Sequence, residues 1–207
     1  MNLENIKAPI YSYEEIRKIA EDFLDEHNSS GEIPVDIELI VEKGMGINII
    51  PIPLELPFGI DALTSVNQKE IRIDLNTCNQ NENRFRFSLA HEVGHLILHK
   101  DIFKAIDYQS IQDFKNIQDK IPSDEYGWLE WHANSFAGLI LVPTTNLEKQ
   151  VEKSVQKLKD EEFTIRYDNY ETILGYVSTA ISKYFSVSHT TVKIRIDKDN
   201  LDLRDYI

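Results

Sequence analysis

The stretch that decides the fold is Arg84-Phe85-Arg86-Phe87-Ser88-Leu89-Ala90-His91-Glu92-Val93-Gly94-His95-Leu96-Ile97-Leu98-His99. His91 and His95 are four residues apart, which on an α-helix separates them by about 40° around the axis and about 6 Å along it. Both imidazoles can therefore reach one metal ion from the same face of the helix. Glu92 follows the first histidine, so its carboxylate points beside such an ion and could take a proton from a water bound to it.

The pattern H-E-x-x-H is typical of zinc peptidases. In the alternative interpretation, the two histidines are ordinary residues on the polar face of an amphipathic helix. The flanking residues favour the metal site, because most of them are apolar: Phe87, Leu89, Ala90, Val93, Leu96, Ile97 and Leu98. Burying two histidines and a glutamate among such residues is costly unless a metal and hydrogen bonds satisfy their polar atoms. We therefore predict that His91 and His95 bind a metal.

A catalytic zinc site takes three protein ligands and keeps an open position for water. The first route to a third ligand is Glu130, in the stretch Trp128-Leu129-Glu130-Trp131-His132-Ala133-Asn134-Ser135-Phe136-Ala137, which reads as a second helix. Asn134 lies one turn further on the same face, where it could accept a hydrogen bond from a ligand histidine. The small residues Ala133 and Ala137 would let this helix approach the metal helix closely.

The second route is Asp101, which completes the spacing H-E-x-x-H-x-x-G-x-x-D with the two histidines. In peptidases with this kind of spacing, the chain turns at the glycine. Leu98 stands at the glycine position here, and no residue nearby breaks the helix. We therefore expect the helix to continue and to carry Asp101 roughly 9 Å along the axis beyond His95. Glu130 is the predicted third ligand.

Composition restricts the classes of function. The chain has 207 residues, enough for one sizeable core. Its formal net charge of −13 disfavours broad contact with nucleic acid or an anionic membrane and favours a basic protein partner. Cys78 is the only cysteine, so no disulfide framework is expected and a reducing compartment fits. We see neither a secretory signal nor an apolar run long enough to span a bilayer, and we expect a cytoplasmic protein.

The spacing of apolar residues predicts an α+β fold that is mostly helical, with a small sheet beside the metal helix. Strands are predicted over residues 47–52, 61–66 and 69–75, and residues 76–83 are expected to form a polar connector. Helices are predicted over 13–27 and 35–43, from about 82 onward through the histidines, from the stretch 121–125 to 141, and around 147–158. Shorter helical patterns occur at 102–106 and 111–117.

The last third of the chain carries the apolar spacing of a helix-turn-helix at Ile181, Phe185, Val187 and Val192. The match is imperfect, because Arg195 stands where an apolar residue is expected and the basic residues are offset by acidic ones. We therefore expect this segment to have a packing role and not to bind nucleic acid directly. The predicted domains are a metallopeptidase core at 1–160 and a C-terminal helical segment at 161–207, packed on the core.

Two motifs occur together: Arg84-x-Arg86-Phe87-Ser88-Leu89-Ala90-His91-Glu92-Val93-Gly94-His95-Leu96-Ile97-Leu98-His99, and then Glu130-x-x-Ala133-Asn134-x-Phe136-Ala137 with Leu139-Ile140-Leu141-Val142-Pro143. Together they resemble the ImmA/IrrE family of bacterial zinc metallopeptidases, over roughly residues 12 to 196. The resemblance implies a thermolysin-like core in which His91, His95 and Glu130 bind Zn²⁺ and Glu92 activates water. Members commonly cleave a helix-turn-helix transcriptional repressor of a mobile element or stress response.

Some members of that family carry their own N-terminal helix-turn-helix domain, for which we expect no room here, so a stand-alone protease acting on a separate repressor fits. A further group should stabilise the oxyanion of the reaction. His132 and Tyr126 are candidates, as are Tyr108 and Tyr167, and the sequence does not rank them. The alternative function is a zinc-containing binding module that sequesters a repressor or toxin without cutting it. The intact Glu92 argues against this module, which has no need for a base.

Overall fold

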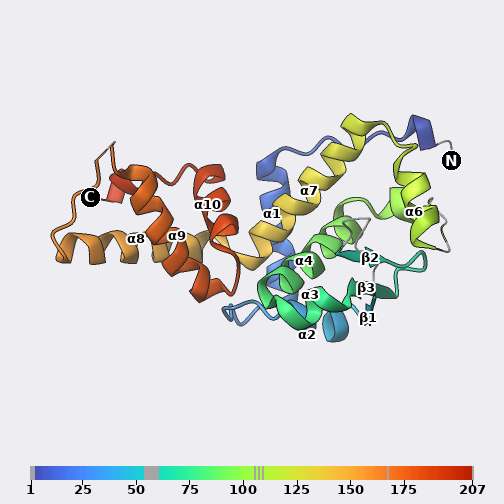
Figure 1. Ribbon diagram of the computed structural model, residues 1–207, viewed down its shortest axis with the longest axis horizontal. Coiled ribbons are helices and arrows are strands. Elements are labelled where there is room, and N and C mark those ends of the chain that lie inside the picture. The colour runs from blue at the N-terminus through green and yellow to red at the C-terminus, as the bar shows by residue number, and fades with distance from the viewer. Residues whose placement is uncertain are drawn as a thin grey trace.

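A computed structural model describes residues 3–53, 61–104, 106, 108, 110–166 and 168–206. The helices are η1 (Leu3–Asn5), α1 (Tyr13–His27), α2 (Ile37–Leu39), the π-helical turn η2 (Ile40–Gly44), α3 (Leu75–Gln80), α4 (Glu82–Leu98), α5 (Lys100–Lys104), α6 (Ile111–Gln118), α7 (Ser123–Leu141), α8 (Thr144–Asp160), α9 (Tyr170–Phe185), α10 (His189–Lys198) and η4 (Leu203–Tyr206). The strands are β1 (Asn48–Ile52), β2 (Ala62–Thr64) and β3 (Glu70–Asp74). The predicted α+β fold, mostly helical with a small sheet, is confirmed (Figure 1).

The sheet has the order β1-β3-β2, with β3 parallel to β1 and antiparallel to β2. Ile71 and Ile73 of the central strand are fully buried. Pro51 lies in β1, an edge strand, where its missing N–H is tolerated more easily than in a central strand. All three predicted strands are present within their predicted ranges. Strand β2 lies against α4, where Thr64 N is 2.9 Å from Glu92 Oε2.

Helix α1 has the bounds that the sequence predicts, because its start is fixed by a capping box. Ser12 Oγ accepts a hydrogen bond from Glu15 N at 3.2 Å, and Ser12 N donates to Glu15 Oε2 at 2.8 Å. The apolar stripe of Ile16, Ala20 and Phe23 is buried. It packs on α7, where the rings of Phe23 and Phe136 meet edge to face with centroids 5.5 Å apart.

The prediction of a polar connector at residues 76–83 is wrong, because Leu75–Gln80 forms helix α3. The signal lies at the end of β3. The side chain of Asp74 accepts a hydrogen bond from Thr77 N at 3.0 Å and so caps the first turn. Thr77 itself is buried. Asp74 fits the strict alternation of β3, so the sequence pattern assigned it to the strand and did not indicate that it also caps a helix.

The expectation that the metal helix continues unbroken past Leu98 to Asp101 is also wrong. Helix α4 ends at Leu98, and His99 leaves the helical region with φ −128° and ψ 21° before α5 begins at Lys100. The ring of His99 is fully buried between those of His95 and His132. The helix therefore breaks at His99 without a glycine or proline there, and the buried ring of His99 accompanies the break.

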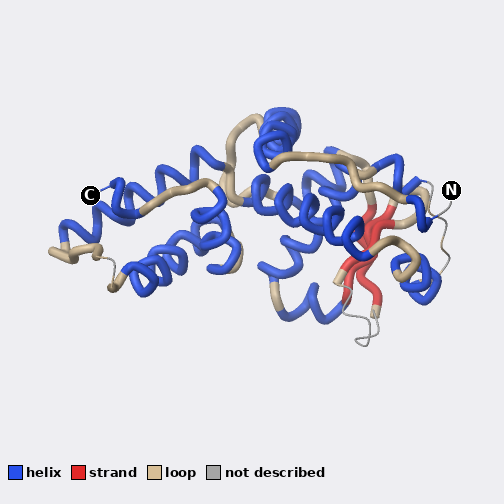
Figure 2. Tube along the Cα trace, turned by 90° about the horizontal axis from the view of Figure 1, so that it is seen from above, coloured by secondary structure: helices blue, strands red, loops and turns tan. Residues whose placement is uncertain are grey.

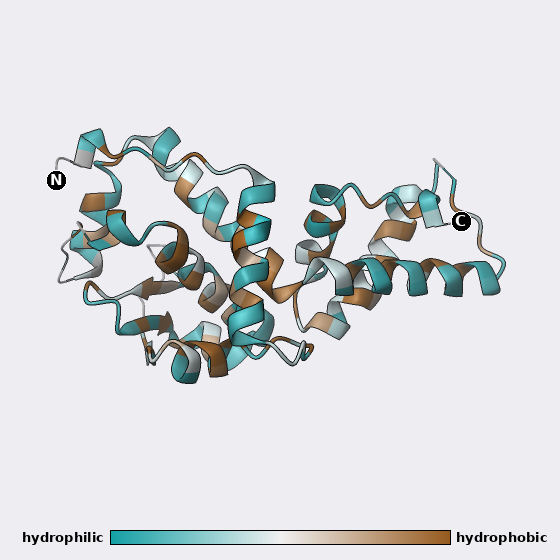
Figure 3. Ribbon diagram, turned by 180° about the vertical axis from the view of Figure 1, so that it is seen from behind, coloured by the Kyte–Doolittle hydropathy of each residue, from teal (hydrophilic) through white to brown (hydrophobic). Residues whose placement is uncertain are grey.

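Helices α8, α9 and α10 with η4 gather at one end of the molecule, and the sheet lies at the opposite end (Figures 1 and 2). We call residues 144–206 the C-terminal lobe. The apolar end of α7 leads into it, and α8 turns a hydrophilic face outward (Figure 3). Buried residues of α7, α8 and α9 belong to one continuous core, including Ile140, Val151 and Ile181. The predicted boundary at residue 160 stays a prediction, and α8 lies with α9 and α10.

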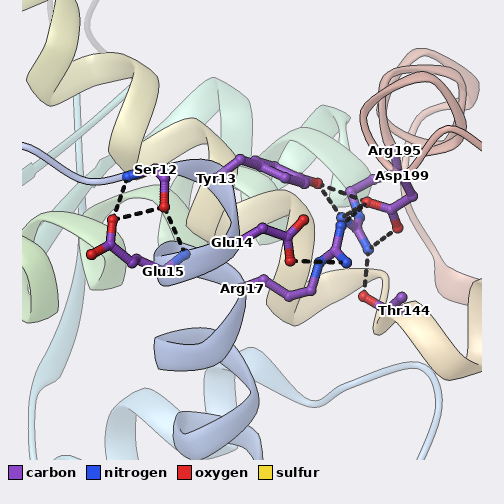
Figure 4. Close-up of polar contacts among 8 residues, drawn as sticks. All are labelled: Ser12, Tyr13, Glu14, Glu15, Arg17, Thr144, Arg195 and Asp199. Carbon is purple, nitrogen blue, oxygen red and sulfur yellow. Dashed lines mark hydrogen bonds and ion pairs between the residues drawn. The ribbon is translucent and has the colours of Figure 1, made fainter.

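The helix-turn-helix resemblance corresponds to α9, a left-handed residue at Ser186 (φ 51°, ψ 53°), and α10, which Ser188 caps. Arg195, the residue that does not fit that pattern, is buried and bonded to polar side chains (Figure 4). Its guanidinium donates to Asp199 Oδ1 at 3.0 Å, to Thr144 Oγ1 at 3.1 Å and to the hydroxyl of Tyr13. Arg17 also donates to Asp199 Oδ1, at 3.0 Å. We call these five residues the Arg195 cluster.

The Arg195 cluster joins the C-terminal lobe to α1. Arg195 is only 2% exposed, so its charge depends on the partners that surround it. Burial raises the pKa of Tyr13 to about 12, so its hydroxyl keeps its proton and donates to Asp199 Oδ1 at 3.1 Å.

Among the helices that the structure describes, none is long and apolar enough to cross a membrane.

Candidate metal centre

Helices α4 and α7 touch backbone to backbone at Gly94. A Cβ atom added to Gly94 would lie 3.0 Å from both Cα and the carbonyl oxygen of Ala133. Glycine on one helix and alanine on the other therefore permit the close approach, as the small residues predicted. This contact brings the turn of α7 that carries Glu130 beside the turns of α4 that carry His91 and His95.

The three residues place one donor atom each around a common point. His91 Nε2 lies 3.0 Å from His95 Nε2 and 3.4 Å from Glu130 Oε2. His95 Nε2 lies 3.3 Å from Glu130 Oε1. Donors held about 2.1 Å from a tetrahedral zinc ion lie about 3.4 Å from one another. Among the described residues, these three form the group of histidine, cysteine and carboxylate side chains spaced to hold a metal. The donor set therefore fits zinc.

His91 and Glu130 stabilise each other's charged form in the metal-free protein. Burial lowers the pKa of His91, but a hydrogen bond to Glu130 and the charges of Glu92 and Glu130 outweigh it and hold this pKa above its ordinary value. Burial raises the pKa of Glu130, but its bonds to His91 and His95 hold it well below its usual range. Glu130 is therefore an ionised carboxylate at neutral pH, as a metal ligand has to be.

The second nitrogen of His91 is held by Asn134. His91 Nδ1 donates to Asn134 Oδ1 at 3.0 Å. In this tautomer the lone pair of Nε2 points to the other ligand atoms, which is the usual role of a polar partner behind a ligand histidine. Asn134 lies where the sequence predicts it, one turn after Glu130 on the same face of α7.

The second nitrogen of His95 leads into a buried chain of imidazoles. His95 Nδ1 lies 3.0 Å from His99 Nδ1, and His99 Nε2 lies 3.2 Å from His132 Nδ1. Burial and the charges of the two neighbouring histidines lower the pKa of His99 to about 2, so its ring is neutral. If His95 binds the metal through Nε2, its Nδ1–H donates to His99, and His99 Nε2–H then donates to His132. One set of tautomers satisfies the whole chain.

The sequence reasoning did not identify Thr64, which holds Glu92. The carboxylate of Glu92 is buried and accepts hydrogen bonds at Oε2 from Thr64 N at 2.9 Å and from Thr64 Oγ1 at 2.6 Å. Both bonds use one oxygen, which leaves Oε1 for a second partner. The strand that contains Thr64 could be predicted, but nothing in the local pattern says that it would lie along α4.

The cavity in front of the three ligands has a volume of about 330 Å³, within the range of clefts that bind ligands. Its polar wall includes the three ligand residues, Glu92, Asn134 and Tyr126, and its apolar wall includes Leu63, Phe87, Phe103 and Phe114. Asp101 is exposed on α5 and does not belong to the ligand group. Of the two routes considered, the structure brings together the residues of the first.

The candidates for the oxyanion stabiliser fall in different places. Tyr126 lines the cavity, and its hydroxyl is bonded to Glu130; burial and the charge of Glu130 raise its pKa, so it keeps its proton. His132 is 1% exposed at the end of the imidazole chain and does not line the cavity. Tyr108 is buried, with a pKa raised by burial and by Glu92, and also lies outside the cavity. Tyr167 lies outside the described residues.

Comparisons with known proteins give a family and a similar solved structure. A model of a peptidase family, described as the IrrE N-terminal-like domain, matches residues 43–197. The solved structure of a Mycobacterium tuberculosis transcriptional regulator is similar, with a TM-score of 0.53 and 16% sequence identity. That match covers 86% of this chain and 45% of the regulator, and at this identity it shows a shared fold alone. No curated protein matches the chain.

Proposed function

This chain belongs to the peptidase family of the IrrE N-terminal-like domain, and from that premise we propose that it is a zinc-dependent endopeptidase acting on a protein. The observation that carries the proposal is the meeting of His91, His95 and Glu130 with a buried carboxylate, Glu92, beside them in one cavity. Three ligands and an open side are what a catalytic zinc site needs, whereas structural zinc sites are closed by a fourth ligand.

In the proposed reaction, His91, His95 and Glu130 would hold a zinc ion, whose chemistry would be to acidify a bound water and to polarise the scissile carbonyl. Glu92 accepts the proton of the attacking water at Oε1, the oxygen that Thr64 leaves open, and later passes it to the departing amine. Thr64 keeps the carboxylate in place for both transfers. Tyr126 is protonated and lies on the cavity wall, and its single O–H is bonded to Glu130 in the metal-free protein; it donates to the oxyanion once Glu130 is engaged as a ligand and that O–H turns to the cavity. Asn134 orients His91.

We propose as substrate a helix-turn-helix transcriptional repressor of a mobile element or stress response. The support is the family resemblance together with the charge of the chain, which is −13 and would attract a basic DNA-binding protein. The acidic charge also supports the proposal that this chain itself does not bind nucleic acid through α10.

Hydrolysis is tested by incubating the zinc-loaded protein with a candidate repressor and following the products by mass spectrometry. The wild type should produce two fragments, and Glu92→Gln should lower the rate about 10²- to 10⁴-fold, because it removes the base while leaving the ligands. Glu21→Gln, the same chemical change at an exposed position of α1, is the matched control and should cut normally. Stable co-purification with the repressor and no fragment in any sample would instead support a non-cleaving module.

A further inference from the structure

A second and larger cavity lies between the C-terminal lobe and the rest of the molecule, next to the metal cavity. Its volume is about 850 Å³, and α10 of the C-terminal lobe faces α4 and α7 across it. Phe87 and Asn134 line both cavities, so the two cavities adjoin at these side chains. We call this second cavity the inter-lobe groove. Its position means that a polypeptide lying over the metal ligands could extend directly into it.

The charge of the inter-lobe groove is opposite to that of the chain as a whole. The chain has 35 acidic and 22 basic residues, yet the described residues that line the groove include no aspartate or glutamate. They include Arg84, Arg195 and Lys198. Arg84 is paired with Asp61 and Arg195 with Asp199, whereas exposed Lys198 forms no ion pair with a described residue. Lys198 is therefore available to an acidic ligand.

Apolar side chains stand beside this lysine. Ile194, one turn before Lys198 on α10, is 54% exposed and lines the groove, so its side chain can contact a ligand there. Trp131 of α7 and Phe87 of α4 are half-buried on the opposite side of the groove. Apolar walls with a few placed polar groups are the usual composition of a binding site.

The wall formed by α10 is fixed before any ligand arrives. The Arg195 cluster ties α10 to α1 (Figure 4), and Arg195 Nε also donates to the carbonyl of Val142 at 3.3 Å, at the end of α7. A Cβ atom at Gly138 would lie 3.3 Å from Arg195 Cδ, so the stem of this side chain packs directly on α7. The groove is therefore pre-organised, which lowers the entropy lost on binding.

We propose that the inter-lobe groove selects the substrate: it binds a stretch of the substrate polypeptide beside the scissile bond, with an acidic side chain at Lys198 and an apolar one at Ile194 and Trp131. The proposal rests on the proposed function, since it assigns a role to the continuity of the groove with the metal cavity. That continuity and the charge of −13 favour a polypeptide over duplex DNA. In this proposal, the face of α10 that lines the groove opposite α4 and α7 contacts the substrate polypeptide.

The test uses a random decapeptide display library selected on zinc-loaded Glu92→Gln protein, which binds without cutting. Selected peptides should be enriched in aspartate or glutamate next to an apolar residue. Fluorescence anisotropy should show Kd values about tenfold weaker for Lys198→Glu and for Ile194→Asp in the same background. Lys183→Glu, the same charge reversal at an exposed position of α9 outside the groove, is the matched control and should leave Kd unchanged. Both groove positions are exposed, and circular dichroism checks that each variant folds.

Three outcomes overturn the proposal: no peptide selected, peptides without acidic enrichment, or Kd values that Lys198→Glu does not change. Preferential binding of a 20-base-pair DNA duplex that depends on Lys198 would also overturn it and assign the groove to nucleic acid. The proposed function can fail separately. If the wild type cuts no protein while peptide binding depends on Lys198, hydrolysis is wrong and the groove stands. If it cuts a protein and peptide binding ignores Lys198, only the groove proposal is wrong.

Discussion

His91 and His95 each have two nitrogens in use, one turned to the ligand group and one to a supporting residue. The supports differ: an exposed amide, Asn134, behind His91, and a buried neutral imidazole, His99, behind His95. Loss of a support of this kind typically weakens metal binding by about 10- to 100-fold. Loss of a ligand removes a bond to the metal and should weaken binding far more.

Zinc affinity of three variants tests this assignment. Glu130→Ala should lose most of the affinity, Asn134→Ala about 10- to 100-fold, and Asp101→Ala almost nothing. Competition with a chromophoric chelator measures all three on the same scale. Asp101→Ala is the matched control, because it removes an exposed carboxylate from the chain just after α4. A large loss in Asp101→Ala with retention in Glu130→Ala would reverse the assignment.

The pair of His91 and Glu130 also gives the metal-free protein a pH dependence. The pKa of His91 is held above 6.5 in the folded state, so its stabilisation is complete below pH 6.5 and is lost as the pH rises through the raised pKa. The pKa of Glu130 is held below 4.5, so its stabilisation is complete above pH 4.5 and is lost as the pH falls through the lowered pKa. Both contributions are complete between these two values.

Chemical denaturation of chelator-treated protein across pH 4 to 9 measures this dependence. The difference in free energy of unfolding between wild type and His91→Ala should be largest near pH 5.5 and should shrink as the pH rises above neutrality. A difference that grows with pH in this range would contradict the charge pairing. The same raised pKa makes protons compete with zinc, so zinc affinity should fall as the pH drops below neutrality.

What the sequence could show at this scale depended on spacing along one helix. The four-residue separation of the histidines and the position of Glu92 follow from helical geometry alone. Thr64 is 28 residues from Glu92, and its role depends on how β2 lies along α4. The bond between His99 and His132 likewise joins residues 33 positions apart, on different helices. Contacts of this kind depend on how the elements pack, and they produce no periodic pattern in the sequence.

At the scale of the elements, the crossing of α4 and α7 decides whether the site exists. Gly94→Ala places a methyl group 3.0 Å from the backbone of Ala133, which cannot move aside as a side chain can. The change should lower the free energy of unfolding by about 1–3 kcal/mol and weaken zinc binding, because it pushes Glu130 away from the histidines.

The matched control is Gly127→Ala in α7, where a Cβ atom would meet nothing within 4 Å. This change should stabilise the protein by up to about 1 kcal/mol, since alanine has the better helix propensity, and leave zinc affinity alone. Urea denaturation and zinc titration of the two variants measure both effects. Equal zinc affinity in both would show that the close crossing does not position Glu130.

Elements with a local start signal could be predicted well. The capping box at Ser12 marks α1, and the alternation of residues 70–74 marks β3. The two errors occur where a residue has two roles. Asp74 is both the last residue of β3 and the cap of α3, and His99 ends α4 while its ring is bonded inside the protein. Local rules assign one role to each residue and therefore miss both.

For the whole molecule, the Arg195 cluster sets how the C-terminal lobe meets α1. Removing one partner of a buried ion pair leaves the other charge buried without compensation. Arg195→Met should therefore lower the free energy of unfolding by about 3–5 kcal/mol. Lys193→Met on the same helix breaks an exposed pair with Glu171 and should cost about 0–1 kcal/mol, which makes it the control. Urea denaturation decides, and equal losses in the two variants would mean that the cluster does not hold the lobe.

The central claim is that α4 and α7 together hold one zinc ion through His91, His95 and Glu130. Anomalous diffraction at the zinc edge, on crystals of zinc-loaded wild-type protein, tests it most directly. We expect one anomalous peak, about 2.0–2.2 Å from His91 Nε2, His95 Nε2 and a carboxylate oxygen of Glu130, with one position facing the cavity left to water. A peak bound by Asp101 in place of Glu130, or a peak away from the two histidines, would contradict the account.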